Sequence, residues 1–284
     1  MIGIFDSGYG GLTIAQALFT ALPQYSYLYV GDNARAPYGQ RNQKEIIHLT
    51  TQGVEYLFNE GCGLVILGCN TASANALRHI QQNIIPGRYP DKRVLGIVVP
   101  TIEQITGVSW HHTEPIQQAL ESERATVGIL ATEQTVKSGA YEIEITKRNP
   151  NIFVIQQACN GLVDAIETGE QRKTEQLVAE AIEQLYSKLP PYHPRIRGVL
   201  LGCTHFELIK DVIKAHLPEA TALYGQPGIV ADSLAAYLMR HPEIAERLDT
   251  SARRRFVTTG DTAQAQAYTE LYTGQNIHFD RVEM

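Results

Sequence analysis

The chain has 284 residues, of which 44% are hydrophobic, and its formal net charge is -6 at pH 7. This length is enough to bury a sizeable core, and we expect two domains rather than one. The acidic balance provides no cationic surface for a phosphate backbone, which argues against a nucleic-acid partner and favours small-molecule chemistry. No apolar run approaches the length of a membrane span and no signal-type segment opens the sequence, so we expect a cytoplasmic protein with no membrane partner.

The four cysteines are far apart in the sequence. Cys62, Cys69, Cys159 and Cys203 form no C-x-x-C pair, so their spacing predicts neither a zinc site nor a disulfide framework, and we expect no bound metal. Cys62 is interpreted as a small buried hydrophobic residue. Cys69 and Cys203 differ because polar residues follow each of them directly.

Short apolar runs alternate with amphipathic stretches through the first half of the sequence. Residues 2–5 predict a buried strand, residues 6–11 a polar corner and residues 12–22 a helix. The corner resembles a dinucleotide-binding loop, but Thr13 stands at the third glycine position, which argues against nucleotide binding. Further strands are expected at residues 25–30, 64–67 and 93–98, and further helices at 44–60 and 73–82.

The second half of the sequence repeats the pattern of the first. Residues 127–132 resemble residues 2–7, and the strand expected at 199–201 ends in Gly-Cys, as the strand at 64–67 does. The repeat predicts an α/β fold of two pseudo-symmetric domains with mainly parallel sheets. The closing segments have no counterpart and are expected to return to the first domain, which gives domains of residues 1–99 with 225–284 and of residues 100–224. The other elements expected here are strands at 152–156, 256–259 and 277–282 and helices at 174–186, 206–216, 229–239 and 262–272.

Polar residues follow both Gly-Cys strand ends, where open α/β sheets bind their ligands. If the two domains face each other, Cys69 and Cys203 lie on opposite sides of one ligand in the cleft between them. One thiolate can then remove a proton from a carbon atom while the other thiol returns a proton to the opposite face, which inverts the configuration. Both cysteines precede helices, whose N-termini favour the thiolate. The sequence therefore predicts a two-base proton exchange.

The residues around the two cysteines differ. Asp6 follows the first strand, beside the expected position of Cys69. The second copy has Ala131 at that place, but His205 follows its cysteine by two residues. Each thiol therefore has its own candidate proton partner, although Asp6 could instead cap a helix and His205 could be a structural histidine. Uncharged hydrogen-bonding groups near the same strand ends can hold carboxylates, and these are Ser7, Asn70, Thr71, Thr132 and Thr204.

Four motifs that are in register across most of the chain carry a family resemblance. Together they resemble the glutamate racemases of the cofactor-independent aspartate/glutamate racemase superfamily. That resemblance implies two α/β domains around an active-site cleft, often assembled as a homodimer. The motifs are Phe5-Asp6-Ser7-Gly8 with Gly10-Gly11-Leu12-Thr13, Asp32 with Pro37-Tyr38-Gly39, Gly68-Cys69-Asn70-Thr71-Ala72, and Gly202-Cys203-Thr204-His205.

The resemblance also implies an activity: racemisation of glutamate without a cofactor, which supplies D-glutamate for peptidoglycan. Cys69, assisted by Asp6, would remove the α-proton of D-glutamate. Cys203, assisted by His205, would remove that of L-glutamate. The family's helix glutamate falls on Glu167, which joins the catalytic set. The substrate-binding positions carried over are Asp6, Ser7, Tyr38, Gly39, Asn70, Thr71, Thr132, Thr204 and His205.

Some segments depart from the family pattern and leave alternatives open. Asn160 follows Cys159 where the family has proline, residues 98–101 lack an acid-Pro-Gly pattern, and the loop expected at 224–228 is unusual. The alternatives are a racemase of the same superfamily that acts on aspartate or another amino acid, a non-catalytic carboxylate-binding paralogue, and a nucleotide-binding α/β protein. The basic run at 253–255 is interpreted as a solvated strand edge rather than a nucleic-acid contact.

Overall fold

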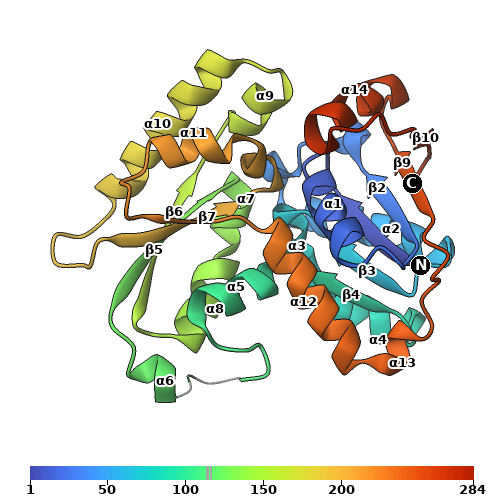
Figure 1. Cartoon of the computed structure of the whole chain (residues 1–284), viewed down its shortest axis with the longest axis horizontal. Coiled ribbons are helices and arrows are strands. Elements are labelled where there is room, and N and C mark those ends of the chain that lie inside the picture. Colours follow the sequence, from blue (N-terminus) through green and yellow to red (C-terminus); the bar gives the residue numbers. More distant parts are fainter. Residues whose placement is uncertain (113–114, 116) are drawn as a thin grey trace. The chain divides into compact units, whose positions relative to one another are not determined.

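The computed structural model describes residues 1–112, 115 and 117–284, with the side chains of residues 270–273 excepted. The chain forms two compact units (Figure 1). The first unit consists of Met1–Ile97 and Pro227–Met284, and the second unit of Val98–Gln226. The chain thus leaves the first unit and returns to it.

The first unit is built on a six-stranded sheet in the order β10-β9-β2-β1-β3-β4, and every pairing in it is parallel. Strands β1, β2 and β3 are fully buried and apolar except for Asp6 at the end of β1, as expected when helices cover both faces of a parallel sheet. The strands are β1 (Ile2–Asp6), β2 (Tyr27–Gly31), β3 (Leu64–Leu67), β4 (Arg93–Gly96), β9 (Arg254–Thr258) and β10 (Asp280–Arg281).

The helices of the first unit pack in two groups. Helix α1 contacts α12 and α14, and α2 contacts α3. Helix α2 begins after Asn42, whose side-chain oxygen accepts a hydrogen bond from the Glu45 amide at 3.0 Å and so caps the helix. The helices are α1 (Gly11–Ala21), α2 (Gln43–Asn59), α3 (Asn70–His79), α4 (Ile85–Arg88), α12 (Pro227–Arg240), α13 (Pro242–Ala245) and α14 (Thr262–Thr273), with short 3-10 helices at Asn33–Arg35 and Tyr38–Gln40 and a π-helical turn at Ile80–Ile84.

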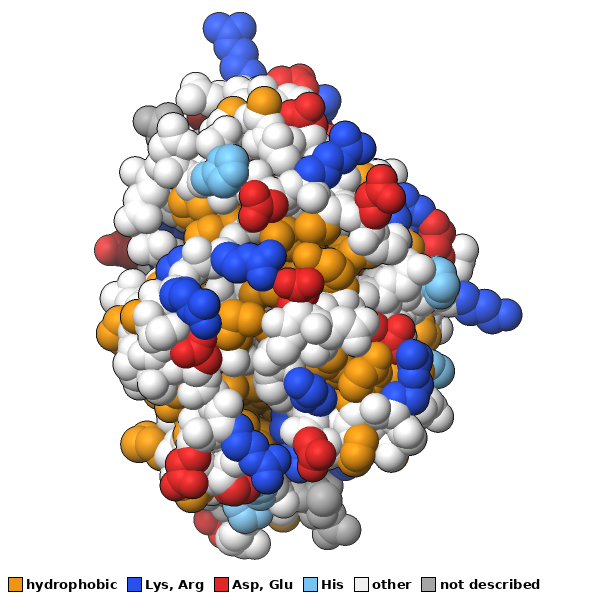
Figure 2. Space-filling view, turned by 90° about the vertical axis from the view of Figure 1, so that its right-hand side faces the viewer, with side chains coloured by type: hydrophobic (Ala, Val, Ile, Leu, Met, Phe, Trp, Pro, Cys, Tyr) orange, Lys and Arg blue, Asp and Glu red, His pale blue; other side chains and the backbone are white. Residues whose placement is uncertain are grey.

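The basic run of residues 253–255 holds the returning segment in the first unit. The Arg254 guanidinium lies over the rings of Phe19 and Tyr27, at 4.7 and 4.6 Å from their centroids. Arg253 pairs with Asp249 at 2.8 Å, and Arg255 pairs with Glu60 at 2.9 Å. Figure 2 shows cationic and anionic side chains intermixed over the face that it presents. These arginines therefore have structural partners on the strand edge.

The second unit is built on a four-stranded parallel sheet in the order β6-β5-β7-β8. Helices α9 and α11 contact α10, and α5 contacts α8, so the helices again form two groups. The elements are β5 (Ala125–Ala131), β6 (Ile152–Ala158), β7 (Ile196–Gly202) and β8 (Ala222–Tyr224), with helices α5 (Val98–Thr106), α6 (Gln117–Leu120), α7 (Glu133–Ser138), α8 (Ala140–Arg148), α9 (Leu162–Glu167), α10 (Gln171–Ser187) and α11 (Lys210–Ala215) and a 3-10 helix at Thr204–Ile209.

The two sheets share one strand order. The order β6-β5-β7-β8 in the second unit matches β2-β1-β3-β4 in the first, and β3 and β7 are the two strands that precede Cys69 and Cys203. The predicted fold class, α/β with two parallel sheets, is confirmed. Strands β9 and β10 extend the first sheet only.

Several expected elements differ from the structure. The strand at 93–98 ends at Gly96, and Val98 begins a helix whose first turn accommodates Pro100 because no hydrogen bond is required of its nitrogen. The strand at 277–282 is reduced to Asp280–Arg281 at the sheet edge. The predicted helix at 206–216 begins as a 3-10 helix and becomes α-helical only at Lys210.

The expected loop at 224–228 is also wrong in part. Tyr224 ends strand β8, and Pro227 begins α12, where its fixed backbone angle suits the first helical position. Among the residues that the structure describes, no helix is both long enough and apolar enough to span a membrane.

Candidate active site in two corners

The first group of predicted site residues lies at the ends of β1 and β3. These strands are parallel neighbours, with Phe5 paired to Leu67, so the segments that leave them emerge side by side. We call Asp6, Ser7, Cys69, Asn70 and Thr71 the Cys69 corner. Because β1 and β3 are parallel neighbours, the residues that follow them lie at the same edge of the sheet.

The Cys69 thiol is buried and lies close to polar groups of its own unit. The hydroxyl oxygen of Ser7 lies 3.3 Å from the sulfur, and the Ala72 amide donates to the sulfur at 3.4 Å. Cys69 is the N-cap residue of α3, so the sulfur lies at the positive end of a ten-residue helix. This environment favours negative charge on the sulfur.

Asp6 is 1% exposed and lies at the junction of β1 and α1. Its Oδ1 accepts a hydrogen bond from the Gly8 amide at 2.7 Å. A Cβ atom added at Gly11 would lie 2.5 Å from Asp6 Oδ2, so glycine is required there for the carboxylate to approach the first turn of α1. Asn70 and Thr71 form the buried first turn of α3, directly after the cysteine.

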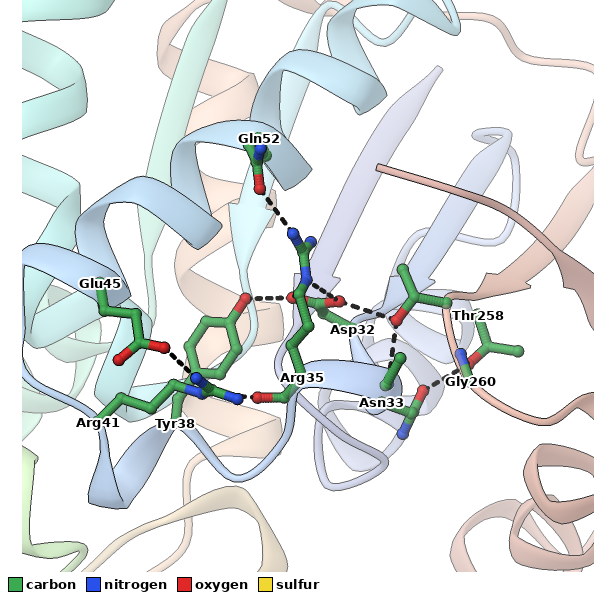
Figure 3. Close-up of polar contacts among 11 residues, drawn as sticks. Asp32, Asn33, Arg35, Tyr38, Arg41, Glu45, Gln52, Thr258 and Gly260 are labelled. Atoms are coloured by element: carbon green, nitrogen blue, oxygen red, sulfur yellow. Dashed lines mark hydrogen bonds and ion pairs between the residues drawn. The ribbon is translucent and has the colours of Figure 1, made fainter.

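Tyr38 and Gly39 lie in the 3-10 turn Tyr38–Gln40, which contacts α3. The Tyr38 ring is buried, and its hydroxyl donates a short hydrogen bond to Asp32 Oδ2 (Figure 3). Burial, reinforced by the charge of Asp32, raises the pKa of Tyr38 well above its usual value, so the hydroxyl remains protonated and acts as the donor.

The second group of predicted site residues lies in the second unit. Cys203 follows β7, which is paired to β5, and Glu167 ends α9. We call Thr132, Glu167, Cys203, Thr204 and His205 the Cys203 corner. Three of these residues are in a chain of contacts. Thr132 occupies the N-cap position of α7, and its hydroxyl lies 3.0 Å from the hydroxyl of Thr135.

The chain of contacts runs from the thiol through an imidazole to a carboxylate. The Cys203 sulfur lies 3.8 Å from His205 Nδ1, and His205 Nε2 lies 2.7 Å from Glu167 Oε1. Burial lowers the pKa of His205, but the hydrogen bonds to Cys203 and Glu167 and their negative charge outweigh it and raise the pKa to about 10. His205 is therefore a buried imidazolium at neutral pH, between two groups that can be anionic.

The remaining two cysteines lie in apolar surroundings. Cys62 is fully buried, as predicted, and burial raises its pKa to about 11. Burial also raises the pKa of Cys159, to about 12. Both therefore remain neutral thiols at neutral pH. Within the described part of the chain, no group of three or more His, Cys, Asp or Glu residues is arranged to hold a metal ion.

Sequence reasoning did not single out Asp32 and Thr259 as individual site residues. Asp32 appeared only as part of a motif, and Thr259 was the end of a predicted strand. In the structure the Thr259 hydroxyl donates to Asp32 Oδ1 at 2.8 Å. The loop after Asp32, which contains proline and glycine, was the available signal for Asp32. Nothing in the sequence signals its contact with Thr259.

Comparison with known proteins supplies independent information. Residues 12–237 match the model of the Asp/Glu/hydantoin racemase family. A glutamate racemase from Jannaschia sp. is 42% identical over 281 residues, which cover 99% of this chain and 99% of that protein.

Solved structures are similar over the whole chain. A glutamate racemase isoform, RacE1, from Bacillus anthracis has a TM-score of 0.84 at 27% identity and covers 100% of this chain and 97% of its own. The glutamate racemase of Francisella tularensis, solved with D-glutamate, has a TM-score of 0.82 at 28% identity, with coverage of 99% and 97%. The resemblance seen in the four motifs and the prediction of an amino-acid racemase are thus confirmed. The chain belongs to the Asp/Glu/hydantoin racemase family.

Proposed function

We propose that this protein interconverts L- and D-glutamate by a two-base mechanism in which Cys69 and Cys203 act on opposite faces of the α-carbon. One observation carries the proposal: two buried thiols follow equivalent strands of two sheets with the same strand order, and each has its own polar partners. The proposal includes an arrangement in which the two corners flank one substrate molecule.

The proton transfers balance between the two thiols. In the L-to-D direction the Cys203 thiolate removes the α-proton, and the electron pair that it leaves is delocalised into the α-carboxylate. The Cys69 thiol then delivers its own proton to the opposite face of the carbon. Turnover leaves Cys203 as the thiol and Cys69 as the thiolate, which is the state required for the D-to-L direction.

The neighbours of each thiol have distinct roles in this proposal. The His205 imidazolium stabilises negative charge on Cys203, and the Glu167 carboxylate, 2.7 Å from the imidazole, keeps the ring oriented and protonated. At Cys69 the helix N-terminus and the Ser7 hydroxyl stabilise the thiolate, and Asp6 is the candidate acid–base partner.

Substrate binding is assigned to groups that bond carboxylates and an ammonium group without a metal. The donors and acceptors are backbone amides at the starts of helices, side-chain hydroxyls, one amide side chain, one carboxylate and one imidazole. The full-length similarity to glutamate racemases, one of them solved with D-glutamate, supports glutamate as the substrate. The assigned residues are Asp6, Ser7, Tyr38, Gly39, Asn70, Thr71, Thr132, Thr204 and His205.

The proposal extends to the cellular setting. The proposed reaction requires no cofactor, because the two thiols carry out both proton transfers. The product D-glutamate would serve peptidoglycan synthesis in the cytoplasm, and we propose a homodimer as the active assembly. These statements rest on the family resemblance.

Racemisation of the wild-type protein tests the proposal. Circular dichroism should show L- and D-glutamate each converting to the racemate, with aspartate turned over at least tenfold more slowly, roughly the discrimination that one missing methylene allows. In D2O, proton NMR should show loss of the α-hydrogen of glutamate. Absence of α-hydrogen exchange would exclude the racemase. Faster turnover of aspartate would retain the two-base chemistry and reject glutamate as the substrate.

A further inference from the structure

A buried carboxylate joins three segments of the first unit. Asp32 is fully buried and accepts hydrogen bonds from Tyr38 and from Arg35 Nε, the latter at 2.8 Å (Figure 3). It also accepts a hydrogen bond from the Thr259 hydroxyl at 2.8 Å. Arg35 is in turn held by Gln52 of α2, at 2.6 Å. A buried carboxylate is stable only when its oxygens are paired in this way, so each donor is coupled to the others through Asp32.

Thr259 brings the returning segment into this network. Its hydroxyl donates to Asp32 and accepts from the Ala34 amide at 3.1 Å, and its own amide donates to the Gly31 carbonyl at 3.0 Å. The single hydroxyl therefore fixes the first part of the loop after β2. The segment that supplies it has no equivalent in the sheet of the second unit.

Tyr38 carries the network to the Cys69 corner. Its ring packs in the same hydrophobic cluster as Cys69, and the 3-10 turn that it begins contacts α3, the helix that starts after this cysteine. Because the Tyr38 hydroxyl donates its proton to Asp32, the hydrogen-bond donors that Tyr38 and Gly39 keep for a substrate are their backbone amides. The position of that backbone depends on Asp32.

We propose that Asp32, held by Thr259, is a positioning residue that fixes the Tyr38–Gly39 turn for substrate binding at the Cys69 corner. The inference rests on the proposed function because it takes this turn to bind substrate. It adds that the C-terminal segment of the chain, far from both cysteines in sequence, sets the affinity of the first unit for the substrate. Asp32 contributes no proton transfer.

The test removes one hydroxyl at a time. Thr259→Val deletes the donor to Asp32, and Tyr38→Phe deletes the other end of the network while keeping the ring in the core. Thr106→Val in the second unit is the matched control, because the Thr106 hydroxyl likewise donates one hydrogen bond, to the Ile102 carbonyl at 2.8 Å, and accepts one from a backbone amide at 3.2 Å. Thr259→Ser should restore the wild-type behaviour.

The expected result is a change in KM without an equal change in kcat. A positioning defect weakens binding of substrate and transition state alike, so KM for both enantiomers should rise about tenfold in Thr259→Val and in Tyr38→Phe, with kcat within about twofold of wild type. The loss of binding free energy in the double variant should be smaller than the sum of the losses in the two single variants, since both act through Asp32. Thr106→Val should leave KM unchanged.

Hydrogen exchange separates this inference from the proposed function. Backbone amides of residues 38–41 should exchange about tenfold faster in Thr259→Val than in the wild type or Thr106→Val, whether or not the protein racemises glutamate. Unchanged exchange there would overturn the inference, as would KM values of Thr259→Val equal to those of Thr106→Val. A wild-type protein without racemase activity would instead reject the proposed function.

Discussion

The Cys69 and Cys203 corners occupy equivalent places in the two sheets but differ in charge. Around Cys69 the sulfur has a hydroxyl and a backbone amide as neighbours, at 3.3 and 3.4 Å. Around Cys203 the neighbour is an imidazolium, itself bonded to the Glu167 carboxylate. The repeated strand order therefore provides the position of each thiol, and the residues after the strand provide its electrostatics.

Two sheets with the same strand order can therefore hold two thiols that have different proton partners. In the proposed reaction the α-hydrogen of L-glutamate is transferred to the Cys203 corner and that of D-glutamate to the Cys69 corner. A thiol supported by a fixed helix N-terminus and a thiol supported by a titratable imidazole need not be identical to carry out opposite proton transfers. Each cysteine needs only to be ionised at the working pH when it acts as the base.

The two corners also differ in how they are held. The Cys69 corner adjoins a loop that is bonded to the C-terminal segment through Thr259 and Asp32. The Cys203 corner is held by residues of α9 and the 3-10 helix within its own unit. Different substitutions should therefore disturb the two corners separately.

The largest effect is expected when either thiol is removed. Cys69→Ser and Cys203→Ser should each lower kcat for both directions of racemisation by about 10⁴-fold, because a serine hydroxyl is not ionised at neutral pH and each direction needs both groups. Circular dichroism with each enantiomer measures the rates. If one variant kept the wild-type rate, the corners would not be two halves of one reaction.

Cys62→Ser is the matched control for this pair. Its sulfur is also buried in the first unit, but it lies outside both corners. The variant should keep the wild-type kcat per folded molecule, although a hydroxyl in an apolar core lowers the free energy of unfolding. A loss of activity equal to that of Cys69→Ser would show that cysteine substitution acts through stability.

A smaller effect should distinguish the two corners. His205→Asn and Asp6→Asn should each lower kcat/KM about 10²-fold. The two enantiomers have equal free energy, so kcat/KM falls equally in both directions and only isotopes can show which proton transfer is slowed. In His205→Asn, α-deuterated L-glutamate should give the larger isotope effect on kcat/KM, because transfer to Cys203 becomes the slow step.

Asp6→Asn should give the opposite pattern, with the larger isotope effect for α-deuterated D-glutamate. Competitive measurements with mixtures of labelled and unlabelled substrate give both values for each variant. Equal isotope effects for the two enantiomers in both variants would contradict the assignment of one proton partner to each thiol.

The fold could be predicted from the sequence wherever a strand is buried on both sides. The strand at Leu64–Leu67 has the predicted bounds, because a short run of apolar residues bounded by glycine is typical of a buried strand. The prediction failed at Val98, where an apolar run continued from a strand into a helix, and at Asp280–Arg281, where two edge residues pair without any apolar pattern. Tertiary contacts decide both places.

The candidate site was predictable to the extent that its residues follow strands. Asp6 ends β1 and Cys69 follows the neighbouring parallel strand β3, while Cys203 follows β7, the equivalent strand of the second sheet. Glu167 entered the catalytic set only through the family resemblance, and its contact with His205 was not predicted, because a helix end and a strand end have no fixed spacing. The contact of Thr259 with Asp32 joins residues that are distant in sequence, and no local pattern specifies it.

The smallest effect concerns the pH dependence of stability, and it too separates the corners. The pKa of His205 is about 10 in the folded protein, against an ordinary value of 6.5. The folded state therefore holds this proton more tightly than the unfolded chain does. Its stabilising contribution is fully present below pH 6.5 and is lost as the pH rises through 10.

Urea unfolding of the wild type and of His205→Asn over this pH range measures the contribution. The free energy of unfolding of the wild type should fall relative to that of the variant, by at most about 1.4 kcal/mol per pH unit for one group. His216→Asn, which alters an exposed histidine bonded to the Val212 carbonyl at 2.9 Å, should follow the wild type. Parallel curves for the wild type and His205→Asn would mean that His205 is neutral in the fold, and the charge difference between the two corners would then disappear.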